Sequence, residues 1–269
     1  MARTGCLTLA LAAWLAVGLR MAAAEPVVQG DVTFWAIDRL IPRCEPVVVS
    51  IEEMFEPGRF AKLGTGCVVN LGDPLVLTCK HVAEATRAGG PLAVGMNTNE
   101  GKLFMAAHVA RVSPTLDLAA LKLDEPLVLP PRWTGAGADS VDPQQAIGPA
   151  SFAADSEITP GTGALTIGFP LGLGNEVDEN HPVSELGIVA QGVYFQPRFL
   201  VNAAASRGSS GAPVFLCRNA KFAGIVYGDV SDTITVTSDS GVKFTHVPYA
   251  TGLTACIPAS VIRAFLEER

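Results

Sequence analysis

The sequence predicts a mostly-β fold that is closed by one C-terminal helix, and three observations lead to this prediction. Aromatic residues make up only 7% of the 269-residue chain, which contains 27 glycines and 19 prolines. Many turn residues combined with few large aromatic side chains favour short strands over long packed helices. Short apolar runs recur between turn residues, and no long amphipathic helix is evident before residue 259.

The first 24 residues have the layout of a secretory signal peptide. Arg3 precedes an apolar run from Gly5 to Leu19, and Ala22, Ala23 and Ala24 offer small residues for cleavage. The apolar run is about 15 residues long, which is shorter than the roughly 20 residues that a membrane-spanning helix needs. We therefore expect export to the periplasm or the medium, and no membrane span after cleavage.

The charge of the chain indicates which partners to exclude. The net charge is −7, and removal of Arg3 and Arg20 with the signal segment leaves 17 basic against 26 acidic residues, a net charge of −9. An acidic chain without basic runs argues against binding to nucleic acid or to an anionic membrane surface.

The strands are expected from Pro46 onward, each bounded by turn residues. The clearest runs are 47–51, 67–69, 75–77, 118–123, 164–167, 187–189 and 223–227. The stretch from Pro130 to Pro160 shows little periodicity and several turn dipeptides, so it predicts a long connection between two halves. Apolar residues at helical spacing after Pro258 predict the terminal helix; they are Val261, Ile262, Phe265 and Leu266.

The cysteines allow one disulfide hypothesis. Cys67 and Cys79 lie symmetrically about Asp73 in a predicted hairpin, so they could face each other across two strands. Export permits a disulfide there, although the geometry is demanding. Two buried free thiols are the alternative. The cysteine spacings match no zinc-binding pattern, and the sequence offers no support for a metal, a nucleotide or another cofactor.

A candidate nucleophile is found in the run Arg207-Gly208-Ser209-Ser210-Gly211-Ala212-Pro213. Acyl transfer by serine needs an exposed hydroxyl on a tight turn, with backbone N–H groups directed at the developing oxyanion. Gly208 permits turn dihedrals that a Cβ would resist. Taken alone, such a cluster of serine, glycine and proline is typical of a plain surface loop.

Two further signals precede this serine in the sequence. The strand 75–78 is followed by Cys79, Lys80 and His81, which places an imidazole at the end of a strand, where it could act as a general base. Asp117 leads directly into the apolar strand 118–123 and could hold His81 in one tautomer. Alone, the histidine is more often structural, and the aspartate more often begins a strand or turn.

Together these stretches resemble the trypsin-like serine peptidases, most closely the bacterial Deg/HtrA-type protease domains. The similarity covers residues 46–268 and includes five further stretches, which are 165–172, 187–189, 199–213, 224–226 and 255–258. The resemblance implies two perpendicular six-stranded antiparallel β-barrels with a C-terminal α-helix, in a domain spanning residues 25–269. The expected boundaries are 46–128 for the first barrel, 129–160 for the connection, 161–258 for the second barrel and 259–268 for the helix. Because the chain stops after that helix, we expect no PDZ domain.

The resemblance also implies roles for individual residues. Ser210 would attack the scissile carbonyl of a polypeptide, His81 would accept and return the proton, and Asp117 would orient His81. The backbone N–H groups of Gly208 and Ser210 would bind the oxyanion.

The resemblance places the specificity pocket at residues 203–206 and 226–228, and above all at Ala204, Ala205, Val226, Tyr227 and Gly228. No carboxylate stands at the expected base of this pocket, so small or medium apolar side chains are favoured over arginine or lysine.

One departure from the family pattern supports an alternative. Ala212 stands where the family usually has a second glycine, and its methyl group could crowd the loop. A catalytically silent protein that uses the same fold to bind a protein partner is therefore the rival hypothesis. An esterase of another fold would place histidine after the serine in the sequence, and here His81 precedes Ser210.

Overall fold

The computed structural model describes residues 28–29, 32–33, 37–86, 91–98, 101–128, 146–171, 181–194, 196–203, 206–237, 240–241 and 243–268. The predicted signal peptide lies outside these residues, as do Ala204, Ala205 and residues 129–145 of the predicted connection. Among the described residues, no helix is long and apolar enough to cross a membrane.

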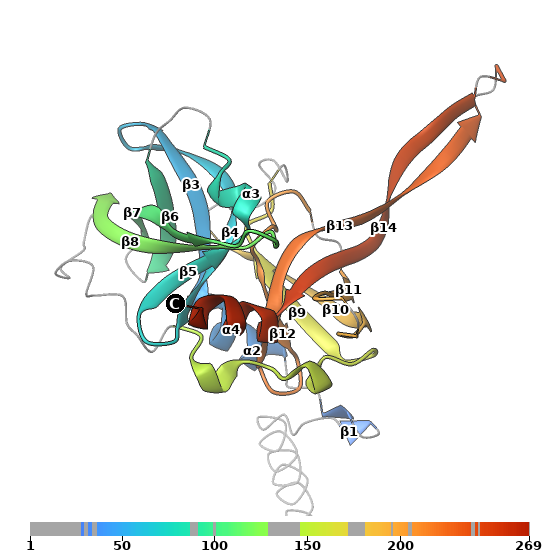
Figure 1. Cartoon of the computed structure of the whole chain (residues 1–269), viewed down its shortest axis with the longest axis horizontal. Helices are drawn as coiled ribbons and strands as arrows, with labels where there is room; N and C mark the ends of the chain where they lie inside the picture. The colour runs from blue at the N-terminus through green and yellow to red at the C-terminus, as the bar shows by residue number, and fades with distance from the viewer. Residues whose placement is uncertain are drawn as a thin grey trace, which may run out of the picture.

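Six strands form the first barrel, on the left of Figure 1. They are β3 (Val48–Glu56), β4 (Arg59–Asn70), β5 (Pro74–Thr78), β6 (Leu92–Thr98), β7 (Gly101–Val112) and β8 (Ala119–Val128). They pair in the order β3-β4-β5-β8-β7-β6, and β6 returns to β3, so the barrel is closed. A single helical turn, α3 (Lys80–Ala83), follows β5. Three short elements and one helix precede the barrel, namely β1 (Val28–Gln29), β2 (Val32–Thr33), α2 (Ile37–Cys44) and η1 (Glu45–Val47).

Six more strands form the second barrel. They are β9 (Gly163–Gly168), β10 (Val183–Gln191), β11 (Phe199–Asn202), β12 (Pro213–Leu216), β13 (Phe222–Thr237) and β14 (Lys243–Pro258). They pair in the order β10-β11-β14-β13-β12-β9, and the pairing of β9 with β10 closes the barrel. The helix α4 (Ala259–Glu267) ends the fold, and Arg111 of β7 donates a hydrogen bond to the Phe265 carbonyl oxygen in this helix. The predicted pair of six-stranded barrels with a terminal helix is therefore confirmed.

The described part of the connection, from residue 146 to residue 162, runs across both barrels. It contains two short turns, η4 (Pro149–Ser151) and η5 (Asp155–Glu157). The Ile147 N–H donates to the Val68 carbonyl in the first barrel, and the Ala153 N–H donates to the Phe222 carbonyl in the second. These backbone bonds tie the two barrels together along one side.

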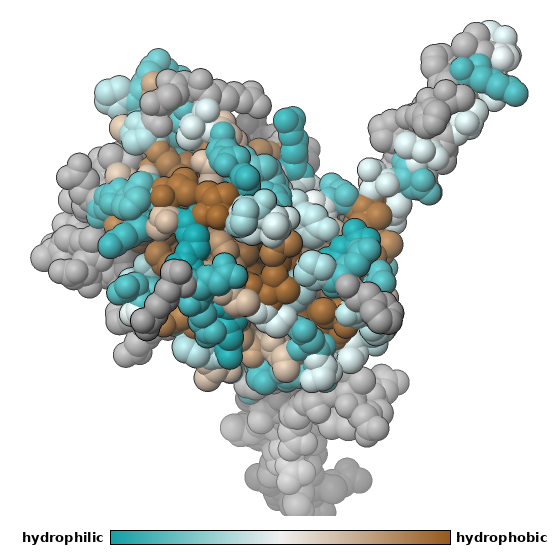
Figure 2. All heavy atoms as spheres, viewed as in Figure 1, coloured by the Kyte–Doolittle hydropathy of each residue, from teal (hydrophilic) through white to brown (hydrophobic). Residues whose placement is uncertain are grey.

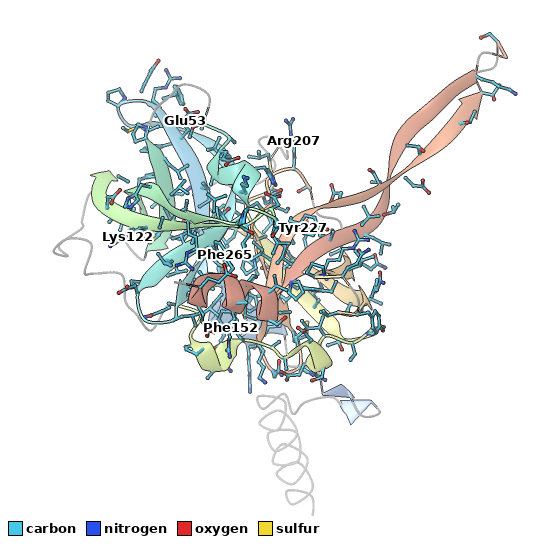
Figure 3. All side chains as sticks on the ribbon, viewed as in Figure 1. Glu53, Lys122, Phe152, Arg207, Tyr227 and Phe265 are labelled. Atoms are coloured by element: carbon cyan, nitrogen blue, oxygen red, sulfur yellow. The ribbon has the colours of Figure 1, made fainter. Side chains whose placement is uncertain are left out.

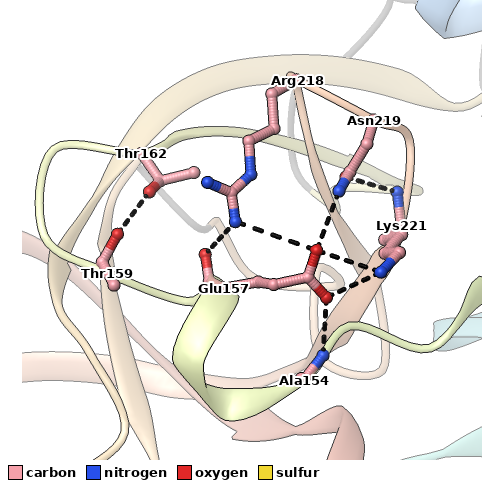
Figure 4. Close-up of polar contacts among 7 residues, drawn as sticks. All are labelled: Ala154, Glu157, Thr159, Thr162, Arg218, Asn219 and Lys221. Atoms are coloured by element: carbon pink, nitrogen blue, oxygen red, sulfur yellow. Dashed lines mark hydrogen bonds and ion pairs between the residues drawn. The ribbon is translucent and has the colours of Figure 1, made fainter. Parts of the chain in front are cut away.

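Glu157 fixes the connection to the turn between β12 and β13 (Figure 4). Its carboxylate accepts hydrogen bonds from Lys221 Nζ at 2.8 and 3.0 Å, and from the Ala154 N–H at 2.9 Å. Burial alone would raise the pKa of Glu157, but these hydrogen bonds and the nearby cations outweigh it, so that the pKa lies below its ordinary value. The ionised form of Glu157 therefore stabilises this junction.

The predicted Cys67–Cys79 disulfide is wrong. Cys67 pairs with Leu77 across the β4–β5 hairpin, so its register is centred on Gly72 and not on Asp73. The Asn70 side chain accepts a hydrogen bond from the Gly72 N–H, which fixes the turn at this earlier position. A shift of one residue in the centre moves every cross-strand partner by two residues. All five described cysteines are buried free thiols.

The last hairpin is much longer than the barrel requires. β13 and β14 pair from Gly224↔Pro258 to Thr237↔Lys243, and their far ends project away from both barrels (Figure 1). We call the projecting part, residues 231–237 and 243–250, the arm. The sequence predicted a strand only over residues 223–227 in this region. Figure 2 shows hydrophilic residues along the described surface of the arm and hydrophobic residues near its base.

Candidate active site

His81 is delivered to the surface by the end of β5. Cys79 has an extended backbone, and the chain then turns into α3, with His81 as its second residue. His81 Nδ1 lies 2.5 Å from Asp117 Oδ2, and the His81 backbone N–H donates to Asp117 Oδ1 at 2.9 Å. A carboxylate can only accept, so Nδ1 carries the proton and Nε2 is left as the acceptor nitrogen. Asp117 thus fixes both the orientation and the tautomer of the imidazole.

The same contact sets the protonation of both groups. The hydrogen bond to Asp117 raises the pKa of His81 above its ordinary value, against a smaller opposing effect of burial. Burial alone would raise the pKa of Asp117, but the hydrogen bonds from the His81 ring and backbone outweigh it and lower that pKa. The side chain of His81 is 52% exposed and that of Asp117 is 30% exposed. The pair is therefore accessible to a substrate.

Ser210 lies on a double turn that only glycine permits. The Ser209 N–H donates to the Ser206 carbonyl at 3.0 Å, and Gly208, the third residue of this turn, has φ +93°. The Ala212 N–H donates to the Ser209 carbonyl at 2.9 Å, and Gly211 has φ +88°. A positive φ at the third position is the mark of a type II turn. A Cβ on Gly208 would lie 2.5 Å from the Phe169 carbonyl oxygen, so the position also lacks space for a side chain.

The first of these turns directs a backbone donor outward. The Arg207 carbonyl accepts a hydrogen bond from the Leu171 N–H. Because C=O and N–H point in opposite directions across a trans peptide, the Gly208 N–H points away from Leu171. Within the described part of the chain, neither the Gly208 N–H nor the Ser210 N–H donates to a protein acceptor. Both donors are thus available to a bound anion.

Thr65 of β4 joins the first barrel to this turn, a role that was not predicted from the sequence. The Thr65 hydroxyl donates to the Gly208 carbonyl at 2.8 Å and accepts from the Phe169 N–H at 2.8 Å. The Thr65 N–H donates to the Ser210 carbonyl at 3.0 Å. Thr65 is completely buried. The sequence feature that could have pointed to Thr65 is its position between two glycines, Gly64 and Gly66. In the structure, a Cβ on Gly64 would lie 3.1 Å from the Ser210 carbonyl oxygen, so the nucleophile turn packs closely against this strand.

Val226 brings the nucleophile turn beside the strand that leads to His81. The Val226 carbonyl accepts from the Gly211 N–H at 2.7 Å and from Cys79 Sγ at 3.2 Å. Cys79 stands two residues before His81 and Gly211 directly follows Ser210, so these bonds bring the segments that carry His81 and Ser210 side by side. Ser210 and His81, both described, are not hydrogen-bonded to each other. Catalytic hydrogen bonds are often long in a free enzyme and shorten when substrate binds.

The structure describes only some of the residues predicted for the specificity pocket. Val226 is buried, and Tyr227 and Gly228 are half-buried at the start of the projecting hairpin. Figure 3 shows Tyr227 at the base of that hairpin. Ala204 and Ala205 lie outside the described residues.

The methyl group of Ala212 is accommodated without crowding. Ala212 is completely buried, and its Cβ faces Gly168 of β9. A Cβ on Gly168 would lie 2.9 Å from the Ala212 Cβ and 3.2 Å from Thr65 Oγ1, so the two facing positions do not have room for two methyl groups. The departure from the expected glycine at 212 is therefore matched by a glycine at 168.

One group of potential metal ligands overlaps the site. Cys79 Sγ, His81 Nδ1 and a carboxylate oxygen of Asp117 lie within 4.8 Å of one another. Thiolate, imidazole and carboxylate are the ligands that zinc uses. Here the His81 and Asp117 atoms already bond to each other, and burial raises the pKa of the Cys79 thiol well above its ordinary value. These contacts favour a protonated Cys79 thiol and a hydrogen-bonded His81–Asp117 pair over metal binding.

The fold of this chain is similar to that of two solved protease structures. The protease domain of MamO from Magnetospirillum magneticum, in its apo form, is 18% identical, with a TM-score of 0.55 over 84% of this chain and 98% of that chain. The HtrA-type protease AlgW with a decapeptide is 19% identical, with a TM-score of 0.57 over 87% of this chain and 68% of that chain. No curated protein matches this sequence.

The sequence also matches a family profile, that of the trypsin-like peptidase domain. The match extends over residues 64–225, which is more than half of the chain and includes His81, Asp117 and Ser210. This chain therefore belongs to the trypsin-like peptidase domain family.

Proposed function

We propose that this protein is an exported serine endopeptidase that cleaves polypeptides through an acyl-enzyme on Ser210. The family and the fold support a peptidase. The serine mechanism is inferred from the arrangement of His81, Asp117 and the turn at Gly208. Export is inferred from the signal-like layout of residues 1–24. We expect no cofactor, because the chemistry needs only these groups.

In the proposed mechanism the Ser210 hydroxyl oxygen attacks the scissile carbonyl carbon, and its proton passes to His81 Nε2. Asp117 stabilises the imidazolium that forms. The carbonyl oxygen becomes an oxyanion and accepts hydrogen bonds from the Gly208 and Ser210 N–H groups. The C–N bond then breaks, and the leaving amine takes the proton from His81. Water, deprotonated by His81, attacks the ester and releases the new carboxyl end together with Ser210.

The observation that carries this proposal is the conformation at Gly208. A silent protein of the same fold has no need to direct the Gly208 N–H away from its own carbonyl groups. In this chain the Arg207 carbonyl is bonded to Leu171 and the Gly208 carbonyl to Thr65, so the peptide groups on both sides of Gly208 are held. A preorganised donor of this kind stabilises a transition state because no reorganisation is needed during the reaction.

We also propose that the pocket beside Val226 accepts small or medium apolar side chains. Val226 and Tyr227 are apolar or aromatic, and the pocket residues expected from the sequence include no carboxylate.

The test is digestion of a proteome-derived peptide library by the mature protein, beginning at Glu25, with the products identified by mass spectrometry. Cleavage after small apolar residues is expected, with Ser210→Ala reducing the rate by roughly 10⁴-fold or more. Equal cleavage by the Ser210→Ala variant, or none by the folded parent protein, would overturn the proposal and favour the binding-module alternative. For export, amino-terminal sequencing of protein from the periplasm or medium should begin at Glu25. Retention of residues 1–24 would contradict that part.

A further inference from the structure

The arm is a two-stranded hairpin that lies beside no other described element. Its strands leave their barrel partners early, since β12 pairs with β13 only as far as Ile225 and β11 pairs with β14 only from Leu253 to Cys256. Over the arm, β13 and β14 pair only with each other. Figure 1 shows no other described segment beside this part of the hairpin. A hairpin alone is marginally stable in water, and packing against a further layer is what stabilises it.

The register of the arm gives its two faces different residues. Residues paired across an antiparallel hairpin lie on the same face, and successive residues of a strand alternate between the faces. A bulge sets residues 245 and 246 of β14 against Thr235, so Phe244 shares the face of Val247. One face therefore holds three successive pairs, which are Asp232↔Tyr249, Ile234↔Val247 and Val236↔Phe244. We call its apolar and aromatic residues, Ile234, Val236, Phe244, Val247 and Tyr249, the apolar face of the arm.

The opposite face of the arm is polar. It holds Ser231, Thr233, Thr235, Thr237 and Lys243, whose side chains are all exposed. Figure 2 shows hydrophilic residues along the described surface of the arm. Such a division is typical of an antiparallel sheet with one face in water and the other packed against a second layer. The described part of the chain places no second layer over the arm, so the pattern indicates a layer that another molecule supplies.

A second copy of the same chain fits this face in area. Burial of a phenylalanine or tyrosine side chain removes about 150–250 Å² from water, and burial of a valine or isoleucine side chain removes about 60–120 Å². The two aromatic and three aliphatic residues of the apolar face then contribute about 500–900 Å² per copy and about 1,000–1,700 Å² for two copies. Specific protein–protein interfaces bury about 1,200–2,000 Å² in total. Two arms therefore reach the area that a stable dimer needs.

A two-fold arrangement also fits the shape of the arm. Two sheets that pack face to face lie about 10 Å apart, and a surface that packs against its own copy is closed by a two-fold axis. The pair Ile234↔Val247 is the middle one of the three, so it lies nearest to that axis. Asp232 is exposed at the base end of the face, where a charge stays hydrated at the rim of an interface. Because the arm projects away from both barrels, the barrels leave room for this approach (Figure 1).

We propose that the apolar face of the arm binds the same face of a second copy, so that the protein is a two-fold symmetric dimer held by its arms. The inference rests on the pairing register and on residue types, and it does not depend on the proposed peptidase function. The second arm buries apolar surface that one hairpin cannot bury alone. A closed two-fold interface stops at the dimer and forms no longer assembly.

The first experiment measures the molar mass of the mature protein, beginning at Glu25, by sedimentation equilibrium. Interfaces of this area have Kd values from micromolar to picomolar, so the protein is studied at about 1–100 µM. We expect either a dimer throughout or a single equilibrium between monomer and dimer. A parent protein that remains a monomer at the highest concentration overturns the proposal, and so does a trimer or a larger assembly.

Two matched substitutions at neighbouring residues of β13 locate the interface. Ile234→Asp places a carboxylate in the apolar face, where burial of an unpaired charge is costly. Thr235→Asp adds the same charge to the exposed polar face. We expect Ile234→Asp to raise the Kd for dimerisation by at least about tenfold, and Thr235→Asp to change it by less than about threefold. An equal effect of the two substitutions, or no effect of Ile234→Asp, contradicts the assignment.

Cross-linking provides a test that does not depend on the folding of Ile234→Asp. The Ile234→Cys substitution places a thiol at the position nearest to the proposed axis, and all five described native cysteines are buried. Air oxidation with copper phenanthroline removes two electrons and two protons from a pair of thiols, and it should join two copies of this variant. Thr235→Cys under the same conditions should remain unlinked. Linking of Thr235→Cys as rapidly as Ile234→Cys would place a different surface at the axis and overturn the proposal.

The same variants distinguish a second copy from a lipid surface. The net charge of −7 does not attract anionic lipids, so neutral phosphatidylcholine vesicles are the probe. A monomeric parent protein that sediments with these vesicles, together with an Ile234→Asp variant that does not, would assign the apolar face to lipid and contradict the dimer. Ser210→Ala should dimerise like the parent protein. Absence of library cleavage would therefore refute the proposed peptidase function and leave the dimer unaffected.

Discussion

Thr65→Val removes the hydroxyl that joins the first barrel to the nucleophile turn while almost preserving side-chain volume. The Gly208 carbonyl loses its donor, and the Phe169 N–H loses its acceptor. Thr65 and Phe169 are almost completely buried, so water does not readily replace either partner. Leaving a buried polar group unpaired costs about 1–3 kcal/mol. Two such groups predict a loss of about 2–6 kcal/mol in the free energy of unfolding.

The effect on activity has a separate origin. Without the Thr65 hydroxyl, the peptide group that follows Gly208 is no longer held, and only the Leu171 bond to the Arg207 carbonyl keeps the Gly208 N–H in its direction. Complete loss of one oxyanion donor typically lowers kcat by about 10²–10³-fold. Because the Leu171 bond remains, we expect a smaller decrease in kcat for Thr65→Val, measured with a cleavable fluorogenic peptide under conditions in which the variant remains folded.

The matched control is Thr65→Ser, which keeps the hydroxyl and removes one methyl group. It should lose only about 1 kcal/mol of stability and retain most of the parent kcat. Urea unfolding followed by far-ultraviolet circular dichroism gives the stabilities. If Thr65→Val, while folded, matches Thr65→Ser in kcat, then the hydroxyl does not position the oxyanion turn and the reasoning fails.

Further predictions concern the His81 pair, the Gly168 contact and the Glu157 junction. The pKa of His81 lies above its ordinary value of 6.5, and only neutral His81 can accept a proton. We therefore expect kcat/KM to rise with pH through a midpoint above 6.5. A midpoint at or below 6.5 would contradict the His81–Asp117 contact. Asp117→Asn should lower kcat by about 10⁴-fold and move that midpoint down, whereas a variant with an unmoved midpoint would show that Asp117 does not act through His81. Gly168→Ala should cost about 1–3 kcal/mol through overpacking against Ala212 and the Thr65 hydroxyl. The double variant with Ala212→Gly should recover part of that loss in a double-mutant cycle, and strictly additive losses would refute the contact. The pKa of Glu157 lies below its ordinary value of 4.5, so its contribution to the free energy of unfolding is complete above about pH 4.5 and is lost as pH falls through the folded-state pKa. Glu157→Gln should therefore lose about 1–3 kcal/mol of stability at pH 7 and less in acid. A stability difference between parent and variant that grows in acid would contradict this prediction.

The catalytic candidates that stand at the ends of short apolar strands, His81 and Asp117, could be predicted from the sequence. The strand before His81 and the strand after Asp117 are short apolar runs, and the ends of both meet in the structure at a 2.5 Å contact. The glycines around Ser210 likewise indicated a turn that needs positive φ. Such features are local, because they depend on the neighbours of each residue along the chain.

The missed features depend on contacts between distant residues or on the register of a turn. Thr65 bonds to Gly208, which lies 143 positions away, and nothing near Thr65 in the sequence names that partner. The disulfide prediction failed because Asn70 caps the hairpin at Gly72, one residue before the expected centre. The arm was missed because its threonines, serines and aspartates resemble a loop, although valine, isoleucine and threonine between Val230 and Thr237 also favour a strand.

The state of the cysteines also could not be predicted from the sequence, because it depends on burial. Burial raises the pKa of Cys44 to about 12 and that of Cys217 to about 11, and it also raises the pKa values of Cys67, Cys79 and Cys256. Cysteines of this kind behave as apolar core residues. Their spacing in the sequence could not distinguish this role from a disulfide.

In the proposed mechanism, Ser210 is an activated nucleophile beside a preformed oxyanion site. The most direct measurement is the intact mass of the mature protein after incubation with a fluorophosphonate probe, alongside Ser210→Ala. We expect addition of one probe to the parent protein, mapped to the peptide containing Ser210, and none to the variant. An unlabelled parent protein that is folded and monodisperse, or equal labelling of the variant, would contradict it.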